Sequence, residues 1–327
     1  MAHAIVVRRY GGPEVLQTET VDPGLPPVGH VLLRQTFVGV NFHDVYVRSG
    51  QYRTLSLPGT PGVEGVGIVE AVGAGVDEPA VGDRVVYATR CHGGYASHRI
   101  LPAQRALRLP AAVDDLTAAG LFVKGLTVVM LLHRVHRLQA GEWILVHAAA
   151  GGVGRLLCQW AARIGATVIG TVGSPAKVPI ARAAGCAEVI DYRREDFAGR
   201  VREISGGRGV DVVYDSVGRD TFDGSLDALA PCGHLVAFGQ ASGPVPPFEL
   251  SRLAAHSTTL SRPILFDYIE RRDALNAMST VLFDTIAAGG VHGETPLVFA
   301  LRDAAEAHRA LESRTTTGPI VLAAQEC

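Results

Sequence analysis

The stretch EWILVHAAAGGVG, residues Glu142–Gly154, decides the fold, and the helix-like run RLLCQWAARIG follows it directly. A buried apolar strand runs into a turn of small residues and then into a helix, the context that makes a glycine motif meaningful. Small residues let the backbone approach a pyrophosphate, and a helix N-terminus offers free N–H groups. Ala149 stands in the place of the first glycine of G-x-G-x-x-G, while Gly151 and Gly154 complete the pattern and Gly152 adds room. The stretch predicts a dinucleotide-binding unit; the alternative is a tight strand–helix turn that binds nothing.

The end of the next strand indicates which dinucleotide is bound. An NAD-binding protein places Asp or Glu about 20 residues after the glycines, where the carboxylate accepts from the ribose 2′-hydroxyl. This position reads TVGSPAK over 171–177 and contains no acid. Ser174 and Lys177 offer a hydroxyl and an ammonium group, which suit a 2′-phosphate, and Tyr192 and Arg193 follow the next strand. The pattern favours NADPH over NADH; the alternative is that Lys177 is a solvated helix residue.

Strands and helices alternate around this motif. The expected helices are 116–133 and 155–164, and the expected strands are 143–147, 167–171, 188–190, 210–214 and 234–238. Alternation over about 140 residues predicts βαβ units and a parallel sheet. Ligands of such sheets collect at the carboxyl ends of the strands. The small residues at 214–218 and 238–243 are therefore candidates to line the ribose and the nicotinamide.

The N-terminal part shows a different pattern, with short strands and few long helical periods. Short β-rich runs, separated by Gly and Pro, lie at 4–7, 31–37, 67–72 and 84–87. They predict a small β-barrel. Near the C-terminal end, the expected elements are helices at 272–288 and 301–312 and a strand at 319–322. This tail is too short to be a domain, so we expect it to pack on the N-terminal part of the 327-residue chain.

Composition narrows the function classes. Lys and Arg total 30 against 32 Asp and Glu, which argues against a general polyanion binder, and the loose arginine cluster at 193–202 is expected to be a solvated helix face. No apolar run approaches the ~18 residues of a membrane span, and the first residues do not read as a signal peptide. The five cysteines are scattered and never spaced as C-x-x-C, which fits neither a disulfide framework nor a structural zinc site. A cytoplasmic protein without a membrane or nucleic-acid partner is expected.

Several motifs occur in an order that identifies a family. HAAAGGVG, FVKGLTV at 122–128, YDSVGRDTF at 214–222 and NFHDVYVRSGQY at 41–52 resemble the zinc-independent quinone oxidoreductases of the medium-chain dehydrogenase/reductase superfamily, which include zeta-crystallin. The resemblance covers essentially the whole chain. It implies an α/β protein with a GroES-like β-barrel catalytic domain, 1–121 and 264–327, interrupted by a Rossmann domain with a doubly wound parallel sheet, 122–263. It also implies NADPH as cofactor, a quinone or other electron-poor carbonyl compound as substrate, and a homodimer through the Rossmann domains.

The same resemblance assigns the cofactor residues. Asn41 would lie near the nicotinamide, and Thr317 and Gly318 would reach the cofactor from the barrel. Ser174, Lys177 and Tyr192 would hold the 2′-phosphate. The full set of expected cofactor-binding residues is Asn41, Thr127, Gly151, Gly152, Val153, Gly173, Ser174, Lys177, Tyr192, Ser216, Phe238, Gln240, Thr317 and Gly318.

The zinc ligands of related dehydrogenases are absent from the sequence. Zinc relatives carry a Cys near Asn41, a G-H-E motif and another Cys early in the nucleotide domain. Here the first region has no Cys, the second reads Gly62-Val63-Glu64, and no Cys lies between 92 and 157. A tetrahedral zinc ion needs three protein ligands at close range. We therefore expect no catalytic metal.

The catalytic expectation is hydride transfer from the nicotinamide C4 to an electron-poor substrate. Without a metal, the developing oxyanion needs other donors, and Asn41, Tyr46 and Tyr52 offer an amide and two phenols. The alternative for either tyrosine is a packed ring with its hydroxyl on the backbone. Asp44 is expected to be a helix N-cap. His43 stands where the motif leads us to expect an apolar residue, and it either tunes the site or faces water.

Two other functions stay open. An enoyl or alkenal reductase on the same scaffold would use Tyr46 or Tyr52 to protonate the α-carbon after hydride addition. A non-enzymatic NADPH-binding protein, as crystallin recruitment in this family implies, would retain the cofactor without turnover.

Overall fold

The computed structural model describes residues 1–313 and 316–325. Contacts group the chain into two compact units, one of residues 1–123, 269–277 and 293–327 and one of residues 124–268 and 278–292. These units differ from the expected domains, 1–121 and 264–327 against 122–263, chiefly at 278–292. The reason is local packing: Leu282 lies against Gly125, and the Gln159 side chain accepts a 2.8 Å hydrogen bond from the His292 N–H.

The second unit is built on a six-stranded sheet with the order β10-β9-β8-β11-β12-β13. Every pairing in it is parallel. The bounds are β8 (Trp143–Val146), β9 (Thr167–Val172), β10 (Glu188–Asp191), β11 (Val210–Asp215), β12 (Leu229–Ala237) and β13 (Thr259–Ser261). Because strand order reverses at β8, this is the expected doubly wound sheet, and its ligand crevice is placed at the carboxyl ends of β8 and β11.

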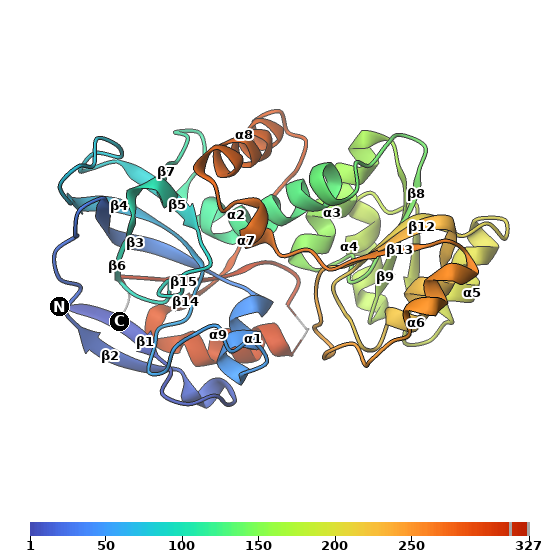
Figure 1. Cartoon of the computed structure of the whole chain (residues 1–327), viewed down its shortest axis with the longest axis horizontal. Coiled ribbons are helices and arrows are strands. Elements are labelled where there is room, and N and C mark those ends of the chain that lie inside the picture. Colours follow the sequence, from blue (N-terminus) through green and yellow to red (C-terminus); the bar gives the residue numbers. More distant parts are fainter. Residues whose placement is uncertain (314–315, 326–327) are drawn as a thin grey trace. The chain divides into compact units, whose positions relative to one another are not determined.

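Four helices connect these strands: α3 (Gly152–Ile164), α4 (Val178–Ala183), α5 (Phe197–Ile204) and α6 (Phe222–Asp227). Right-handed crossovers send α3 and α4 to one face of the sheet and α5 and α6 to the other. Helices α5 and α6 contact each other, and they lie side by side in Figure 1. The core between the layers is apolar, with Leu145, Ile169, Val213 and Leu235 fully buried.

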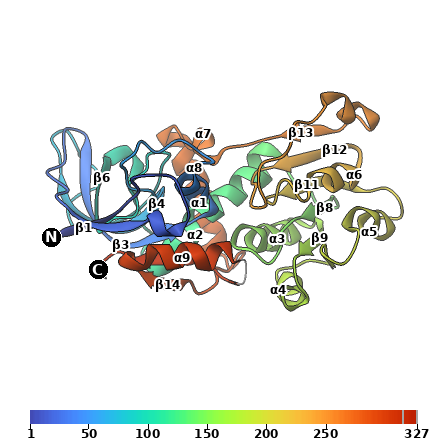
Figure 2. The ribbon, with the colours of Figure 1, turned by 90° about the horizontal axis from the view of Figure 1, so that it is seen from below.

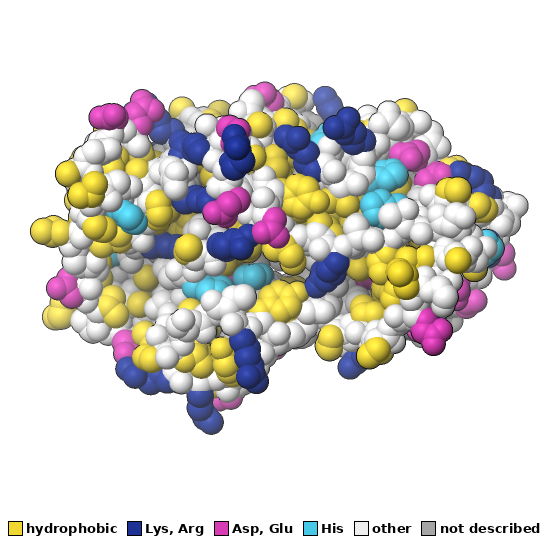
Figure 3. All heavy atoms as spheres, viewed as in Figure 1, with side chains coloured by type: hydrophobic (Ala, Val, Ile, Leu, Met, Phe, Trp, Pro, Cys, Tyr) yellow, Lys and Arg dark blue, Asp and Glu magenta, His cyan; other side chains and the backbone are white. Residues whose placement is uncertain are grey.

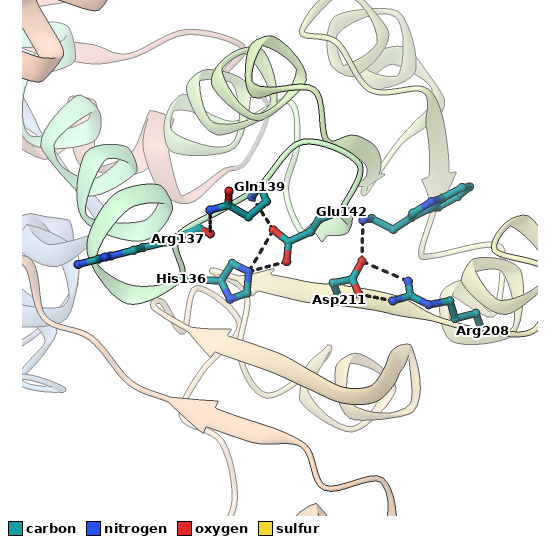
Figure 4. A network of polar contacts seen from close by, with 7 residues as sticks. His136, Arg137, Gln139, Glu142, Arg208 and Asp211 are labelled. Atoms are coloured by element: carbon teal, nitrogen blue, oxygen red, sulfur yellow. Dashed lines mark hydrogen bonds and ion pairs between the residues drawn. The ribbon is translucent and has the colours of Figure 1, made fainter.

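The amino edge of the sheet is joined by a polar network (Figure 4). Glu142 accepts hydrogen bonds from the Gln139 N–H at 2.6 Å and from Nε2 of His136 at 3.1 Å. Asp211 accepts from the Trp143 N–H at 2.9 Å and pairs with Arg208. Asp211 thus satisfies the first backbone N–H of β8, and Glu142 one in the turn before it, at the opposite edge of the sheet from the glycine turn.

The first unit is built on a seven-stranded sheet with the order β14-β15-β3-β4-β5-β7, to which β6 adds by pairing with β3. The bounds are β3 (His30–Val40), β4 (Glu64–Val72), β5 (Arg84–Ala88), β6 (His98–Pro102), β7 (Leu107–Arg108), β14 (Leu297–Ala300) and β15 (Ile320–Ala323). The C-terminal strand β15 pairs antiparallel with β3. The tail therefore returns to the N-terminal part, as expected. A separate hairpin joins β1 (Ala2–Val6) and β2 (Gln17–Val21).

Helices α1 (Phe42–Ser49) and α9 (Ala304–Glu312) belong to this first unit (Figure 2). Val38 and Leu322 from the sheet, Val47 from α1 and Ala304 and Ala307 from α9 share one buried core. Two further helices are α7 (Leu265–Tyr268) and α8 (Arg272–Ala287), and short 3₁₀ segments lie at Pro13–Val15, Ala103–Arg105, Pro175–Lys177, Leu250–Ala255 and Leu301–Asp303.

Helix α2 (Asp115–Met130) continues into a π-helical turn, Leu131–Val135. In the part of the chain described, Asp115–Val135 is the one helix long and apolar enough to cross a membrane, with a mean hydropathy of 1.7. The 18-residue stretch of this helix over which the hydropathy is averaged is nevertheless 67% buried. Such burial is characteristic of a core helix, because core helices are also apolar all round.

Charged side chains of both signs are interspersed on the surface face seen in Figure 3. The loose arginine cluster expected at 193–202 is engaged locally. Arg200 pairs with Glu203 at 2.6 Å, Arg194 lies 3.7 Å from Asp191, and Arg202 donates to the carbonyl of Asp227 at 3.0 Å.

Candidate functional site

The turn between β8 and α3 brings backbone close to backbone. Ala148 has a φ of +52°, a left-handed conformation that costs a non-glycine residue of order 1 kcal/mol. Ala149 is accommodated because its methyl group faces Gly170 on β9, where an added Cβ would lie 2.8 Å away. A Cβ on Gly154 would lie 2.3 Å from the carbonyl oxygen of Ala148. The turn therefore tolerates alanine at the first motif position and requires glycine at the last.

Gly151 is the N-cap of α3, and Gly152 and Val153 form its first turn. All three are half-buried. The stem of Lys124 lies beside Gly152, where an added Cβ would be 3.2 Å from Cδ. Lys124 is only 8% exposed, and Thr127 follows it by three residues on α2, which places both on one helix face. Lys124 is a functional candidate that the sequence assignment missed. The signal was present, because it is one of two lysines in the chain and lies inside FVKGLTV.

The expected 2′-phosphate residues gather at the ends of β9 and β10. Ser174 is the N-cap of the 3₁₀ turn that ends at Lys177. The Tyr192 N–H donates to the carbonyl of Val172 at 3.2 Å. The Tyr192 hydroxyl lies over Gly173, and a Cβ added to Gly173 would be 3.1 Å from it. The structure thus brings a hydroxyl, a phenol and an ammonium-bearing side chain to one corner of the sheet edge.

A buried polar network shapes the carboxyl ends of the central strands. The fully buried Asp215 accepts from the N–H groups of Val217 and Gly218 at 2.7 and 3.0 Å. Ser225 donates to the same carboxylate at 3.1 Å and lies 3.0 Å from Nε2 of His147. Nδ1 of His147 lies 2.8 Å from the hydroxyl of Thr171. The network joins the ends of β8, β9 and β11 and holds the loop that begins at residue 216.

Burial lowers the pKa of His147, although nearby Asp215 raises it. The imidazole is thus neutral and bridges two hydroxyls, one at each nitrogen. Asp215 and His147 are positioning residues that the sequence analysis did not identify. Each lies at a strand end, but no local pattern shows that the two ends share one network.

The loops after β11 and β12 lie against each other. The Phe238 N–H donates to the carbonyl of Asp215 at 2.9 Å, and the Ala241 N–H to that of Ser216 at 3.2 Å. Gly218 has a φ of +88°, and a Cβ there would lie 2.8 Å from Cα of Gln240. Ser216, Phe238 and Gln240 are all half-buried. The structure therefore brings these three expected cofactor residues together along one edge.

In the first unit, Asn41 is the N-cap of α1. The expectation that Asp44 is the N-cap is wrong. Asp44 is the third helical residue, and its carboxylate accepts from the Asn41 N–H at 2.9 Å, because an acid at this position reaches back over the first turn. The Asn41 amide donates to the buried carboxylate of Glu64 at 2.6 Å, and Glu64 also accepts from the Val123 N–H at 2.9 Å. Glu64 orients Asn41, a role that the sequence analysis missed.

The two expected catalytic tyrosines belong to a group of four rings. The Tyr46 and Tyr52 rings meet edge to face with centroids 5.1 Å apart. His43 meets Tyr52 at 5.8 Å, and the ring of His92 lies nearly parallel to that of His43 at 5.9 Å. We call these four side chains the ring cluster. It places two phenols, which can donate hydrogen bonds, within a single group of flat side chains.

A chain of hydrogen bonds joins two residues of helix α1, Arg48 and Asp44, to other segments of the first unit. Arg48, 3% exposed, pairs with Glu312 through two bonds of 2.7 and 2.9 Å. Its Nη1 also lies 3.3 Å from Nδ1 of His308. Nε2 of His308 lies 2.9 Å from the Tyr95 hydroxyl, which donates to Asp44 at 3.2 Å. Since a guanidinium can only donate, Nδ1 of His308 is the acceptor and Nε2 carries the proton.

Thr317 and Gly318 lie just before β15 in the first unit, separated from it by Pro319, and Thr317 is exposed. Their approach to the cofactor stays a prediction. Within 1–313 and 316–325, no group of three or more His, Cys, Asp and Glu side chains is arranged to hold a metal ion.

Family comparisons agree with both units. Residues 27–111 match the alcohol dehydrogenase GroES-like domain family, and residues 152–280 match the zinc-binding dehydrogenase family. The chain is 46% identical to a quinone oxidoreductase of Pseudomonas aeruginosa over 98% of this chain and 99% of the relative. It is 42% identical to a 2-haloacrylate reductase of a Burkholderia species over 99% of this chain and 100% of the relative.

Solved structures similar to this chain come from the same kinds of protein. A crystal structure of the Escherichia coli quinone oxidoreductase complexed with NADPH superposes with a TM-score of 0.95. The two chains are 44% identical, over 98% of this chain and 99% of the other. The 2-haloacrylate reductase structure gives a TM-score of 0.87 at 42% identity, covering 99% of both chains. This chain belongs to the quinone oxidoreductase family of the medium-chain dehydrogenase/reductase superfamily.

Proposed function

We propose that this protein is an NADPH-dependent quinone reductase that transfers hydride without a metal ion. The observation that carries the proposal is the edge of the parallel sheet, where the A-x-G-x-x-G turn lies together with Ser174, Lys177 and Tyr192, and where the stretch 171–177 that ends β9 carries no acid. The small-residue turn fits a pyrophosphate, and the corner fits a 2′-phosphate. The family relatives named quinone oxidoreductase support the same cofactor and acceptor.

The residues of the nucleotide unit would bind NADPH and orient its nicotinamide. NADPH, when bound, supplies the hydride from its nicotinamide C4. Backbone N–H groups at Gly151–Val153 and the ammonium of Lys124 would meet the pyrophosphate. The loop after β11, fixed by Asp215, would hold Ser216 along the ribose. The half-buried position of Phe238 and Gln240 would keep water from the dinucleotide.

The residues of the first unit act on the acceptor. Asn41, held by Glu64, and the phenols of Tyr46 and Tyr52 would donate hydrogen bonds to the oxygen that gains negative charge. A quinone needs no strong general acid, because the hydroquinone anion is stabilised by its aromatic ring. Neutral donors therefore suffice for this class of acceptor.

The function is tested by following NADPH absorbance with panels of quinones and α,β-unsaturated carbonyl compounds. Turnover with quinones, undiminished by a metal chelator and slower with NADH, is expected. Turnover on enoyl or alkenal substrates alone would move the protein to the alternative reductase class, with a tyrosine protonating the α-carbon. Bound NADPH without turnover on either panel would favour the binding-protein function.

We also propose that two copies associate through the nucleotide unit. Strand β13 (Thr259–Ser261) is an edge strand of the sheet, and an edge strand offers backbone groups to a second copy. Light scattering during gel filtration should give twice the 34.5 kDa chain mass; a mass of one chain would contradict the dimer. The cytoplasm is the proposed location.

A further inference from the structure

The two histidines of the ring cluster have no part in the proposed function. His43 is the second residue of α1, three residues before Tyr46, so the two side chains share one helix face. It stands at a position where the motif leads us to expect an apolar residue. The near-parallel ring of His92, tilted by 20°, comes from a distant loop to meet it. The two polar rings lie beside the expected catalytic Tyr52, so they are candidates to determine which acceptor the protein binds.

The loop that carries His92 is anchored by a buried cation. Arg99 is only 6% exposed, and its Nη2 donates to the carbonyl oxygens of Cys91 and His92, the latter at 3.1 Å. The guanidinium also lies over the ring of Tyr87, with 4.5 Å between Cζ and the ring centroid. The position of His92 against His43 is therefore held by the fold rather than left to a free loop.

The hydrogen bonds of His92 indicate its tautomer. Nε2 lies 3.0 Å from Oγ1 of Thr54, whereas Nδ1 is buried and has no partner among the described residues. A buried N–H without an acceptor is rarer than a bare acceptor nitrogen. The proton therefore resides on Nε2 and is donated to Thr54. The hydroxyl hydrogen of Thr54, an exposed residue, is left to point outward.

Both imidazoles are uncharged at neutral pH. Burial, and then His92, lower the pKa of His43 to about 4. Burial, and then Arg99, lower the pKa of His92. The two rings therefore place neutral, polar imidazoles beside Tyr52 and add no positive charge there. Two uncharged imidazoles suit a flat, uncharged acceptor that carries a polar ring substituent. They give no Coulomb attraction to a substrate that carries a carboxylate.

We propose that His43, held in place by His92, is a specificity-determining residue that selects hydroxylated quinones. The imidazole both donates and accepts hydrogen bonds, as a ring hydroxyl does, so the two groups can pair in either direction. The inference rests on the proposed quinone reductase function. It adds the substrate class to that function.

The test compares 1,4-naphthoquinone with its 6-hydroxy derivative, whose hydroxyl is too far from either carbonyl to form an internal hydrogen bond. The ratio of kcat/KM for the two quinones is measured with the natural protein and with His43→Leu. One neutral hydrogen bond predicts that the ratio falls about 2- to 12-fold in the variant. Comparing ratios cancels the difference in intrinsic reactivity between the quinones. His43→Gln, which keeps a donor and an acceptor, should recover part of the ratio, and His92→Leu should lower it less than His43→Leu does.

A control and three outcomes make the result decisive. His256→Gln, an exposed residue of the other unit, should leave the ratio unchanged. A ratio and both kcat/KM values that stay unchanged in a folded His43→Leu protein would overturn the proposal and leave the reductase function standing. An equal loss of kcat/KM on both quinones, which also leaves the ratio unchanged, would overturn it as well, because His43 would then act on the reaction or the fold. A natural protein inactive on every quinone would instead refute the proposed function.

Discussion

Replacing Lys177 by Ala is expected to weaken NADPH binding about 10- to 150-fold while leaving NADH binding unchanged. A hydrogen bond from a charged donor contributes about 1.5–3 kcal/mol, which corresponds to that range. Lys177 ends the turn after β9 next to Ser174, and Tyr192 covers Gly173 from β10. The only group that the two dinucleotides do not share is the 2′-phosphate, so the loss should appear with NADPH alone.

The binding constants of both dinucleotides should be measured by fluorescence or calorimetry on each variant. Lys177→Arg should retain much of the preference, because the charge is kept. Arg182→Ala is the matched control, since Arg182 is an exposed cation on the neighbouring helix α4. An equal loss for NADPH and NADH would show that Lys177 does not read the 2′-phosphate. It would then contribute to the turn itself.

The second large effect is a loss of stability in acid that depends on His308. Burial, and then Arg48, lower the pKa of His308 to about 3. Protonation would place a hydrogen on Nδ1, which faces the guanidinium, and would remove the acceptor that Arg48 uses. The unfolded chain has an ordinary histidine pKa near 6.5. The unfolded state therefore binds the proton first as the pH falls.

The two pKa values determine whether stability rises or falls with pH, and over which pH range. A depressed pKa in the folded protein gives full stability above pH 6.5 and a progressive loss as the pH falls toward 3. At 1.36 kcal/mol per pKa unit, the loss of unfolding free energy amounts to roughly 5 kcal/mol. The groups facing the ring are Arg48 and Tyr95, with Glu312 and Asp44 beyond them.

Urea unfolding between pH 7 and pH 4 measures the larger part of this loss, about 3 kcal/mol. His308→Gln keeps an uncharged acceptor and donor but no titrating ring, so its stability should fall less steeply over this range. His256→Gln, an exposed histidine, is the control and should keep the slope of the natural protein. Identical slopes for all three proteins would assign the acid lability to other buried groups, such as His43 or His147.

Several features could be predicted from the sequence because they are local. The strand, the small-residue turn and helix α3 are contiguous in Glu142–Ile164, so their order alone predicts the βαβ unit. The absent acid and the present Lys177 lie within seven residues, at 171–177. Compact apolar runs located five of the six strands of the parallel sheet, with β9, β10 and β11 each ending one residue beyond the prediction. Such signals survive in a sequence because each depends on neighbours along the chain. The edge strand β13 was not predicted, and β12 begins at Leu229 rather than at 234.

Other features were decided only by tertiary structure. Arg48 and His308 are 260 residues apart in the sequence, and Asn41 meets Glu64 across 23 residues. Asp44 was expected to cap the helix, but the backbone placed the cap at Asn41. No periodicity records which strand ends or loops become neighbours. The reason is physical: turns and helices follow from short-range sterics and hydrogen bonding, whereas these polar contacts form only when a shared hydrophobic core brings distant segments together.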